Sequence, residues 1–330
     1  MNTLTPVDRI EVQIIVDNVT DGLSTVPSFV ETEMAYHWRH GMKAMSGACL
    51  CCAAHGLSCL ITAHRGNTRR TLLFDTGPDS DVFRRNVTLL KTDLGVVDAM
   101  VLSHGHWDHA GAMPLALDMI RAGTPERQIP VHMHPGMFAT RAMRAPDGSM
   151  RLFADVPSVA ELEAHGATVH LAVEPEVILD AMFQISGEIP RVTPFERGMP
   201  GQYQRLNDGQ DWVPDPLLID ERSVAVHVAS RGLVIFSACS HAGIVNVLEH
   251  ARTQFPDIPV LCVMGGFHLS GENEKIIPET VAALRRFNIE TIAAGHCTGW
   301  RAITALANAF GPGVLAPLAV GKRYSFGSSR

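Results

Sequence analysis

Short apolar runs alternate with segments of helical periodicity along most of the chain. In the first third, the pattern predicts strands at residues 10–18, 58–65, 71–77 and 99–104, with a helix at 79–90. In the last third, it predicts three strands that each lead into a helix: 232–239 into 242–255, 258–266 into 274–287, and 290–295 into 298–310. This alternation favours an α/β fold.

The three late strands each end in a short polar loop that contains a histidine. His241, His268 and His296 follow the first, second and third of these strands. Loops at the carboxyl ends of strands are where α/β proteins place ligands. We therefore expect these loops to carry functional residues.

Residues 125–222 break the pattern, because they are richer in Pro, Gly, Arg and Asp and their periodicity is weaker. Loops as long as these are usually functional or disordered. We expect the segment to be a loop-rich insertion that caps a site, within one domain that spans residues 1–330.

Composition and charge indicate which kinds of partner to expect and in which compartment the protein acts. The formal net charge is −7 and no block is rich in Lys or Arg, so a nucleic-acid surface is not indicated. No apolar segment approaches the roughly 20 residues needed to cross a bilayer, and the first residues lack the features of a secretion signal. We expect a cytoplasmic protein that acts on a small molecule, and the net charge does not exclude an anionic one. The sequence leaves open whether it forms a homo-oligomer.

Seven cysteines are an odd number for a chain of 330 residues, which argues against a disulfide framework and favours reduced thiols. Four of them cluster at positions 49, 51, 52 and 59, but their spacing matches no zinc pattern. Buried, inert thiols are the favoured interpretation of this cluster.

Three histidines and an aspartate lie within six residues, starting at the last residue of the predicted strand 99–104: His104, His106, Asp108 and His109. His104 and His106 are two residues apart and can point the same way, while Asp108 and His109 start the next turn. One loop could thus hold two metal ions, with two imidazoles for one ion and a carboxylate with an imidazole for the other. Zinc accepts this mixture of ligands, and manganese or iron would accept it too. A solvated histidine-rich loop explains four ligands in six residues less well.

The segment HGHWDH resembles the HxHxDH signature of the metallo-β-lactamase superfamily, and TLLFDTG at 71–77 resembles the strand that precedes this motif. The resemblance implies a four-layer αββα sandwich with two divalent metal ions along one edge, zinc in first place and manganese or iron as alternatives. It also implies that Asp75 orients a ligand histidine through the free ring N–H of that histidine.

The resemblance extends to further ligands. His296 matches the late histidine that completes the second metal, and Cys239 stands where a bridging aspartate normally ends a strand. A thiolate there suits zinc, although an inert core cysteine is nearly as good an interpretation. The usual histidine of the first metal is missing. Glu188 takes its place in the nearest matching segment, but His241 is the favoured replacement.

Several segments resemble one branch of the superfamily, named for 7,8-dihydropterin-6-ylmethyl-4-(β-D-ribofuranosyl)aminobenzene-5′-phosphate synthase, which joins a pterin to an arylamine and displaces pyrophosphate. These segments lie at 16–18, 54–58, 187–191, 239–246, 265–269 and 295–299. The branch implies a phosphate- or ester-bearing substrate. Arg191, Glu188 and His55 are then expected at the substrate, and His268 is expected as a proton donor or substrate ligand. Three of them also have an ordinary structural interpretation: Arg191 as a solvated arginine, His268 as a histidine buried against the glycines, and His55 as a histidine at the entry to a strand.

These expectations favour a hydrolase of a small ester, lactone, amide or phosphodiester, in which a metal-bridging hydroxide is the nucleophile and Asp108 orients it. A transferase that displaces pyrophosphate or a phosphoester would use the same site. The alternatives are a pterin–arylamine synthase of the methanopterin type, a di-iron oxidoreductase, and a binding protein without catalysis. The last would be expected to have lost some of the ligands.

Overall fold

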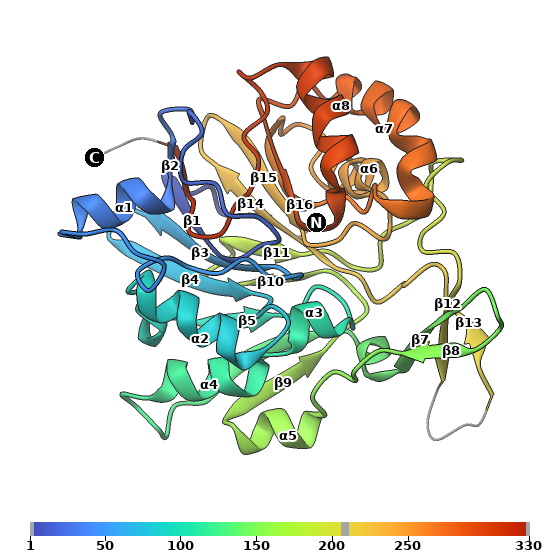
Figure 1. Cartoon of the computed structure of the whole chain (residues 1–330), viewed down its shortest axis with the longest axis horizontal. Helices are drawn as coiled ribbons and strands as arrows, with labels where there is room; N and C mark the ends of the chain where they lie inside the picture. Colours follow the sequence, from blue (N-terminus) through green and yellow to red (C-terminus); the bar gives the residue numbers. More distant parts are fainter. Residues whose placement is uncertain (1–2, 206–210, 328–330) are drawn as a thin grey trace.

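Most of the apolar runs form two β-sheets that pack face to face (Figure 1). The computed structural model describes residues 3–205 and 211–327. The first sheet has eight strands in the order β2 (Val30–Glu31), β18 (Arg323–Gly327), β1 (Arg9–Val16), β3 (Ser58–Arg65), β4 (Thr68–Phe74), β5 (Ala99–Val101), β6 (Ile129–Met133) and β9 (Ala167–Leu171). The second has six, in the order β10 (Glu176–Ile178), β11 (Phe183–Ile185), β14 (Ser223–Val228), β15 (Gly232–Ser237), β16 (Val260–Gly266) and β17 (Thr291–Gly295).

Helices cover the outer face of each sheet. Helices α2 (Ser80–Leu89), α4 (Met113–Arg121) and α5 (Val159–Ala164) pack on the first sheet, and α6 (Ile244–Gln254), α7 (Ile277–Leu284) and α8 (Trp300–Phe310) pack on the second. Two shorter helices, α1 (Glu33–Arg39) and α3 (Trp107–Ala110), lie in connections. The result is the four-layer αββα sandwich that was expected from the resemblance, and this expectation is confirmed.

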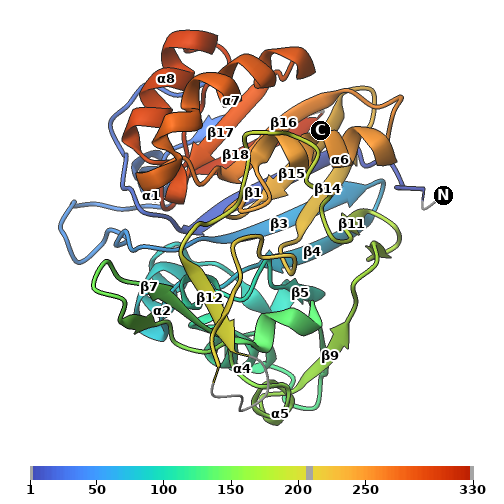
Figure 2. The ribbon, with the colours of Figure 1, turned by 90° about the vertical axis from the view of Figure 1, so that its right-hand side faces the viewer.

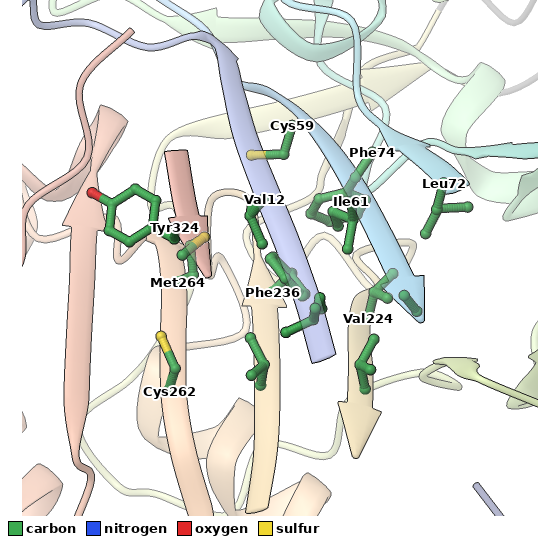
Figure 3. Close-up of a cluster of buried hydrophobic side chains, with 14 of the residues drawn as sticks. Val12, Cys59, Ile61, Leu72, Phe74, Val224, Phe236, Cys262, Met264 and Tyr324 are labelled. Atoms are coloured by element: carbon green, nitrogen blue, oxygen red, sulfur yellow. The ribbon is translucent and has the colours of Figure 1, made fainter. Parts of the chain in front are cut away.

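The main core lies between the two sheets, where apolar side chains from both inner faces meet (Figure 3). Val12, Ile61 and Phe74 come from the first sheet, and Phe236 and Met264 from the second; all are almost fully buried. Burial of one such side chain stabilises the fold by about 1.5–3 kcal/mol relative to exposure.

Strands β15, β16 and β17 run parallel to one another and are buried along their whole length. Helices cover one face and the first sheet covers the other, so nearly every position is apolar. This is why the three apolar runs stand out in the sequence. Because the strands are parallel and adjacent, the loops that follow them lie side by side.

The segment 125–222 is more regular than expected. Strands β6 and β9 join the first sheet, and β10 and β11 join the second. Polar side chains such as His132 and His170 interrupt the apolar pattern of β6 and β9, which hides these strands in the sequence. Among the described residues, one small sheet lies outside the sandwich, with the order β13 (Val213–Pro214), β12 (Gln202–Arg205), β7 (Thr140–Arg144) and β8 (Met150–Leu152) (Figure 2).

Among the described residues, no helix combines the length and the apolar character that crossing a bilayer would require.

Candidate metal centre

The loop after β5 carries the motif HGHWDH and is fixed by close packing at Gly105. A Cβ atom at this position would lie 2.1 Å from Arg141 Nη1 and 2.4 Å from the carbonyl oxygen of Met137, so no larger residue fits without displacing them. The amide of Gly105 donates a hydrogen bond to Asp220 Oδ2 at 2.9 Å. Helix α3 then begins at Trp107, with His106 at its N-cap. Because Gly105 has no side chain, the loop can pack directly against Arg141 and Met137.

Three buried imidazoles form the first group of candidate ligands: His104, His106 and His241. Nε2 of His104 lies 3.0 Å from Nδ1 of His106 and 3.2 Å from Nε2 of His241. Burial lowers the pKa of His106 to about 4 and holds the pKa of His104 and His241 well below the usual range. Neutral imidazoles offer the lone pairs that metal binding requires.

A second group surrounds the carboxylate of Asp108. Its Oδ2 lies 3.4 Å from Nε2 of His55, 3.4 Å from Nε2 of His296 and 3.6 Å from Nε2 of His109. Burial opposes ionisation of this carboxyl group, but His109 and His296 hold its pKa far below the usual range. Burial also opposes the protonation of His109 and so lowers its pKa. The neighbouring carboxylates of Asp108 and Asp75 outweigh burial and raise this pKa to about 9.

Cys239 lies between the two groups. Its Sγ atom and one ring nitrogen each of His104 and His109 are all within 4.8 Å of one another. His104 and His109 belong to the loop after β5, whereas Cys239 follows β15 in the other sheet. The seven residues expected as metal ligands are therefore brought together at one edge of the sandwich: His104, His106, Asp108, His109, Cys239, His241 and His296.

Side-chain oxygens hold the outer ring nitrogens of three of these histidines. Asp75 Oδ2 accepts from Nδ1 of His109 at 2.7 Å, and the same carboxylate accepts from the amide and the hydroxyl of Ser103, both at 2.7 Å. Gln202 Oε1 lies 2.8 Å from Nε2 of His106, and Asn18 Oδ1 lies 2.9 Å from Nδ1 of His296. An N–H donated outward leaves the inward nitrogen with its lone pair. Asp75 thus has the position expected of it.

Sequence reasoning did not assign roles to Gln202 or Asn18. Asn18 belongs to the segment 16–18 that resembles the pterin-enzyme branch. The resemblance therefore marked this segment but did not say what Asn18 does. Asp17, its neighbour, accepts from the amide of His296 at 2.9 Å. No motif points to Gln202, which belongs to the small sheet.

Two of the expected substrate residues lie apart from the ligand groups. The carboxylate of Glu188 lies 3.2 Å from Nε2 of His134, so Glu188 does not replace the missing histidine, whereas His241 reaches His104. The guanidinium of Arg191 donates to the backbone carbonyls of Ile189 and Leu217. These carbonyls engage both of its terminal nitrogens, while its Nε is buried without a hydrogen-bond partner among the described residues. A role of Arg191 at the substrate stays a prediction.

The other two lie at the site. His55 contacts Asp108 and its side chain is 58% exposed, so it is the solvent-facing member of the second group. The ring of His268 packs on the ring of His241, with centroids 4.3 Å apart. A narrow pocket runs beside these two rings and is also lined by Glu196, Arg197, Phe267 and Asn273. The exposed ring thus lies on the side of His55, whereas the pocket beside His268 has room for about one water molecule.

Known proteins resemble this chain in sequence and in fold. Residues 70–179 match a family described as a β-lactamase superfamily domain. The chain is 30% identical over 251 residues to the 7,8-dihydropterin-6-methyl-4-(β-D-ribofuranosyl)-aminobenzene-5′-phosphate synthase of Methanocaldococcus jannaschii. The matched residues make up 75% of this chain and 82% of the synthase. It is 29% identical over 256 residues to the uncharacterized protein MJ0448 of the same organism, over 77% of this chain and 88% of that protein.

Solved structures show the same fold. The crystal structure of Tm1679, a metal-dependent hydrolase of the β-lactamase superfamily, has a TM-score of 0.71 at 21% identity and covers 97% of this chain and 100% of its own. The metallo-β-lactamase fold protein YhfI from Bacillus subtilis has a TM-score of 0.50 at 11% identity, with the same coverage.

Proposed function

The chain belongs to the metallo-β-lactamase superfamily, and on this premise we propose that it is a dinuclear-metal-dependent hydrolase of a small ester- or phosphate-containing molecule. One observation carries the proposal: two adjoining groups of buried ligand atoms, His104 with His106 and His241, and Asp108 with His296, meet at one edge of the sandwich. Loops from both sheets contribute to each group.

The first group fits a cation better than it fits a hydrogen-bond network. Each imidazole nitrogen carries either one N–H or one lone pair. Nε2 of His104 faces a ring nitrogen of His106 and another of His241, and Nδ1 of His241 is buried without a hydrogen-bond partner among the described residues. A cation bound by all three lone pairs resolves this crowding. Nitrogen, oxygen and sulfur ligands together suit zinc, with manganese or iron as alternatives for the nitrogen and oxygen ligands.

When bound, a pair of divalent ions supplies Lewis acidity and lowers the pKa of water towards about 7. The protein's own part is orientation. Asp75, Gln202 and Asn18 fix the rings of His109, His106 and His296 by accepting their outer N–H groups. The ionised Asp108 accepts a hydrogen bond from the attacking water and so directs its lone pair at the substrate.

His268 is placed to give a proton to the leaving group, because its ring borders the pocket beside His241. His55 is exposed and can contact the substrate from the solvent side while its Nε2 remains near Asp108. In a hydrolysis, the bond from carbonyl carbon or phosphorus to the leaving group breaks as the bond to the water oxygen forms. His268 supplies the proton that the departing group needs.

The synthase relative favours a second candidate, in which an arylamine rather than water is the nucleophile and pyrophosphate leaves from a pterin donor. The same ligand groups would serve this transfer. It requires in addition a pocket that receives the arylamine beside the ligand groups.

The test pairs elemental analysis of the purified protein with two assays: a hydrolase panel of phosphodiesters, lactones, β-lactams and thioesters, and an assay for pyrophosphate release from a pterin diphosphate with and without an arylamine. We expect zinc or manganese and turnover on at least one hydrolase substrate. Pyrophosphate release only in the presence of the arylamine would instead support the synthase. Redox-active iron with oxygen consumption would contradict both proposals and support the oxidoreductase.

A further inference from the structure

Two cysteines and a histidine form a third group beside the ligand groups described above. Cys239 follows β15, His268 follows β16 and Cys297 follows β17, so the three come from the adjacent loops of three parallel strands. The two Sγ atoms lie 3.1 Å apart, and these sulfurs and one ring nitrogen of His268 are all within 4.8 Å of one another. Cys297 and His268 have no part in the proposed dinuclear ligand set.

The two sulfurs are separate thiols, because a disulfide bond would be about 2.05 Å long. Both cysteines are buried, with 3% and 7% of their surface exposed. Gly266 makes room for this pair, since a Cβ atom there would lie 2.6 Å from Sγ of Cys297 and 2.5 Å from the carbonyl oxygen of Cys239's neighbour Ala238. The backbone is therefore shaped around the thiol of Cys297.

His268 adds an independent sign of a missing partner. Its backbone has a φ of 43°, in the left-handed region that a histidine rarely adopts. Its Nδ1 atom is buried and has no hydrogen-bond partner among the described residues. A strained residue with an unpaired buried nitrogen persists only where the surroundings or a ligand compensate for it.

We propose that Cys239, Cys297 and His268 bind a thiophilic divalent ion, zinc in first place, at a soft-metal subsite that adjoins the nitrogen and oxygen groups. Two thiolates and an imidazole are three of the four ligands that zinc takes, and they leave one position open. The imidazole of His268 binds the ion through one ring nitrogen, so its other N–H is the one that serves as the proposed proton donor. Binding forms two metal–sulfur bonds and one metal–nitrogen bond, and it releases the two thiol protons to water. Cys239 also lies near His104 and His109, so it links this subsite to the others.

Two of the other buried cysteines show what an ordinary core thiol looks like in this chain. Cys59 and Cys262 lie in the apolar core between the sheets, with 1% and 0% of their surface exposed (Figure 3). In the part of the chain that the structure describes, neither belongs to a candidate ligand group. Cys262 lies on β16, the same strand that His268 follows, and is therefore the matched control.

The test is spectroscopic and needs no substrate. We would load the reduced full-length protein with Co²⁺ and measure thiolate-to-cobalt charge-transfer absorption, then load it with Zn²⁺ and count sulfur neighbours at about 2.3 Å by X-ray absorption. The wild-type protein should show absorption from two thiolates. Cys297→Ser should lose about half of it, because one of the two sulfur ligands is gone, and should bind one ion fewer per chain. Cys262→Ala should match the wild type.

Several results would overturn the subsite. These are no charge-transfer absorption in the wild type, an unchanged spectrum in Cys297→Ser, or an equal loss in Cys262→Ala. A disulfide-linked pair of peptides that contain Cys239 and Cys297, in a digest of protein purified without reductant, would mean that the pair is a disulfide. The Zn²⁺ measurement on the wild type decides the case even if a variant fails to fold.

Failure of the hydrolase proposal is a separate outcome. Asp108→Ala removes a ligand of the second group but none of Cys239, Cys297 and His268. It should therefore lose turnover and keep the charge-transfer absorption.

Discussion

The ring orientation of the ligand histidines depends on single side chains that accept their outer N–H groups. For His106 this side chain is Gln202, which packs on the loop from the small sheet and is itself 1% exposed. Gln202 also donates to Asp215 Oδ2 at 3.1 Å, so its amide orientation is fixed with the oxygen towards His106. The proton on Nε2 leaves Nδ1 of His106 with its lone pair facing His104.

Gln202→Leu removes this acceptor at nearly the same volume. We expect zinc affinity to fall about 10- to 100-fold, the usual cost of losing a hydrogen-bond partner of a metal-ligating histidine. A competition titration against a chromogenic chelator measures it. Gln204→Leu, on the same strand, is the control and should bind zinc as the wild type does. Equal affinities in Gln202→Leu and the wild type would exclude this role.

Removal of a ligand itself has a larger effect. His106→Ala and Asp108→Ala should each abolish turnover, because one takes away an imidazole lone pair and the other takes away the carboxylate that orients the attacking water. His106 caps the short helix α3 and Asp108 lies in it, and neither side chain belongs to the apolar core, so we expect the chain to stay folded by circular dichroism. Full activity in a metal-free preparation of either variant would contradict the assignment of the site.

The buried carboxyl group of Glu221 should make the free energy of unfolding depend on pH. One substitution, Glu221→Gln, separates its contribution from those of the other titratable groups. Burial raises its pKa from 4.5 to about 7, although the amides of Ala242 and His241 donate to the carboxylate and oppose the shift. Between these values the native state holds a proton that the unfolded state has released, so the free energy of unfolding falls as pH rises. The wild type should lose up to about 3 kcal/mol relative to Glu221→Gln across this window.

Urea unfolding of the metal-free wild type and of Glu221→Gln, at several pH values from about 4.5 to 8, measures this difference. Chelation is needed because a nearby cation would favour the charged carboxylate. If the two stability curves run parallel over this range, the raised pKa is not a property of the folded protein.

The residues of the candidate site were predictable from sequence to the extent that they cluster along the chain. His104, His106, Asp108 and His109 share one loop, and Asp75 lies in the strand that precedes the motif. The partners that hold the rings could not be predicted in this way. Gln202 is 96 residues from His106, and Asn18 is 278 residues from His296. Only the tertiary fold brings such pairs together.

At the scale of elements, the small sheet is tied to the loop of the HGHWDH motif by one buried arginine. Arg141 on β7 donates to the carbonyl of Gly105 at 2.8 Å and to the carboxylates of Asp220 and Asp215 at 2.6 and 3.2 Å. Asp220 in turn accepts from the amide of Gly105. The carbonyl and the amide of Gly105 are thus held by Arg141 and Asp220, respectively.

Arg141→Met keeps most of the side-chain volume but leaves two carboxylates without their cation. Loss of one partner of a buried ion pair costs about 3–5 kcal/mol, so we expect a clear fall in thermal stability together with weaker zinc binding. Arg144→Met is the matched control, because Arg144 lies on the same strand and its contact with Tyr203 is exposed. It should change the free energy of unfolding by less than about 1 kcal/mol. Equal effects of the two changes would contradict the anchoring role.

The elements themselves differ in how well the sequence predicts them. Strands β15, β16 and β17 are buried on both faces, so their composition is apolar throughout. Strand β9 forms one edge of the first sheet and β6 is its neighbour; both carry histidines, so their alternation is weak. The segment 125–222 was therefore expected to be loop-rich, although four of its strands belong to the sandwich.

At the scale of the whole molecule, the ligand groups join the two halves of the sandwich. His104, His106, Asp108 and His109 follow β5 of the first sheet, whereas Cys239, His241 and His296 follow β15 and β17 of the second. A cation held by ligands from both sheets is bound only when the sheets are packed together. Its binding free energy therefore adds to the free energy of unfolding of the whole molecule.

This arrangement predicts that metal stabilises both halves together. Zinc at about 100 times its dissociation constant should add about 2.7 kcal/mol for each independent site, and a chelator should remove the gain. Scanning calorimetry gives the shift in melting temperature, and hydrogen exchange locates it. We expect slower exchange in β4 and β5 of the first sheet as well as in β15 and β17 of the second. His106→Ala should show a smaller shift at the same zinc concentration. Slower exchange confined to the HGHWDH loop would mean that the ion is held by that loop alone, and that the loops of the second sheet do not bind it.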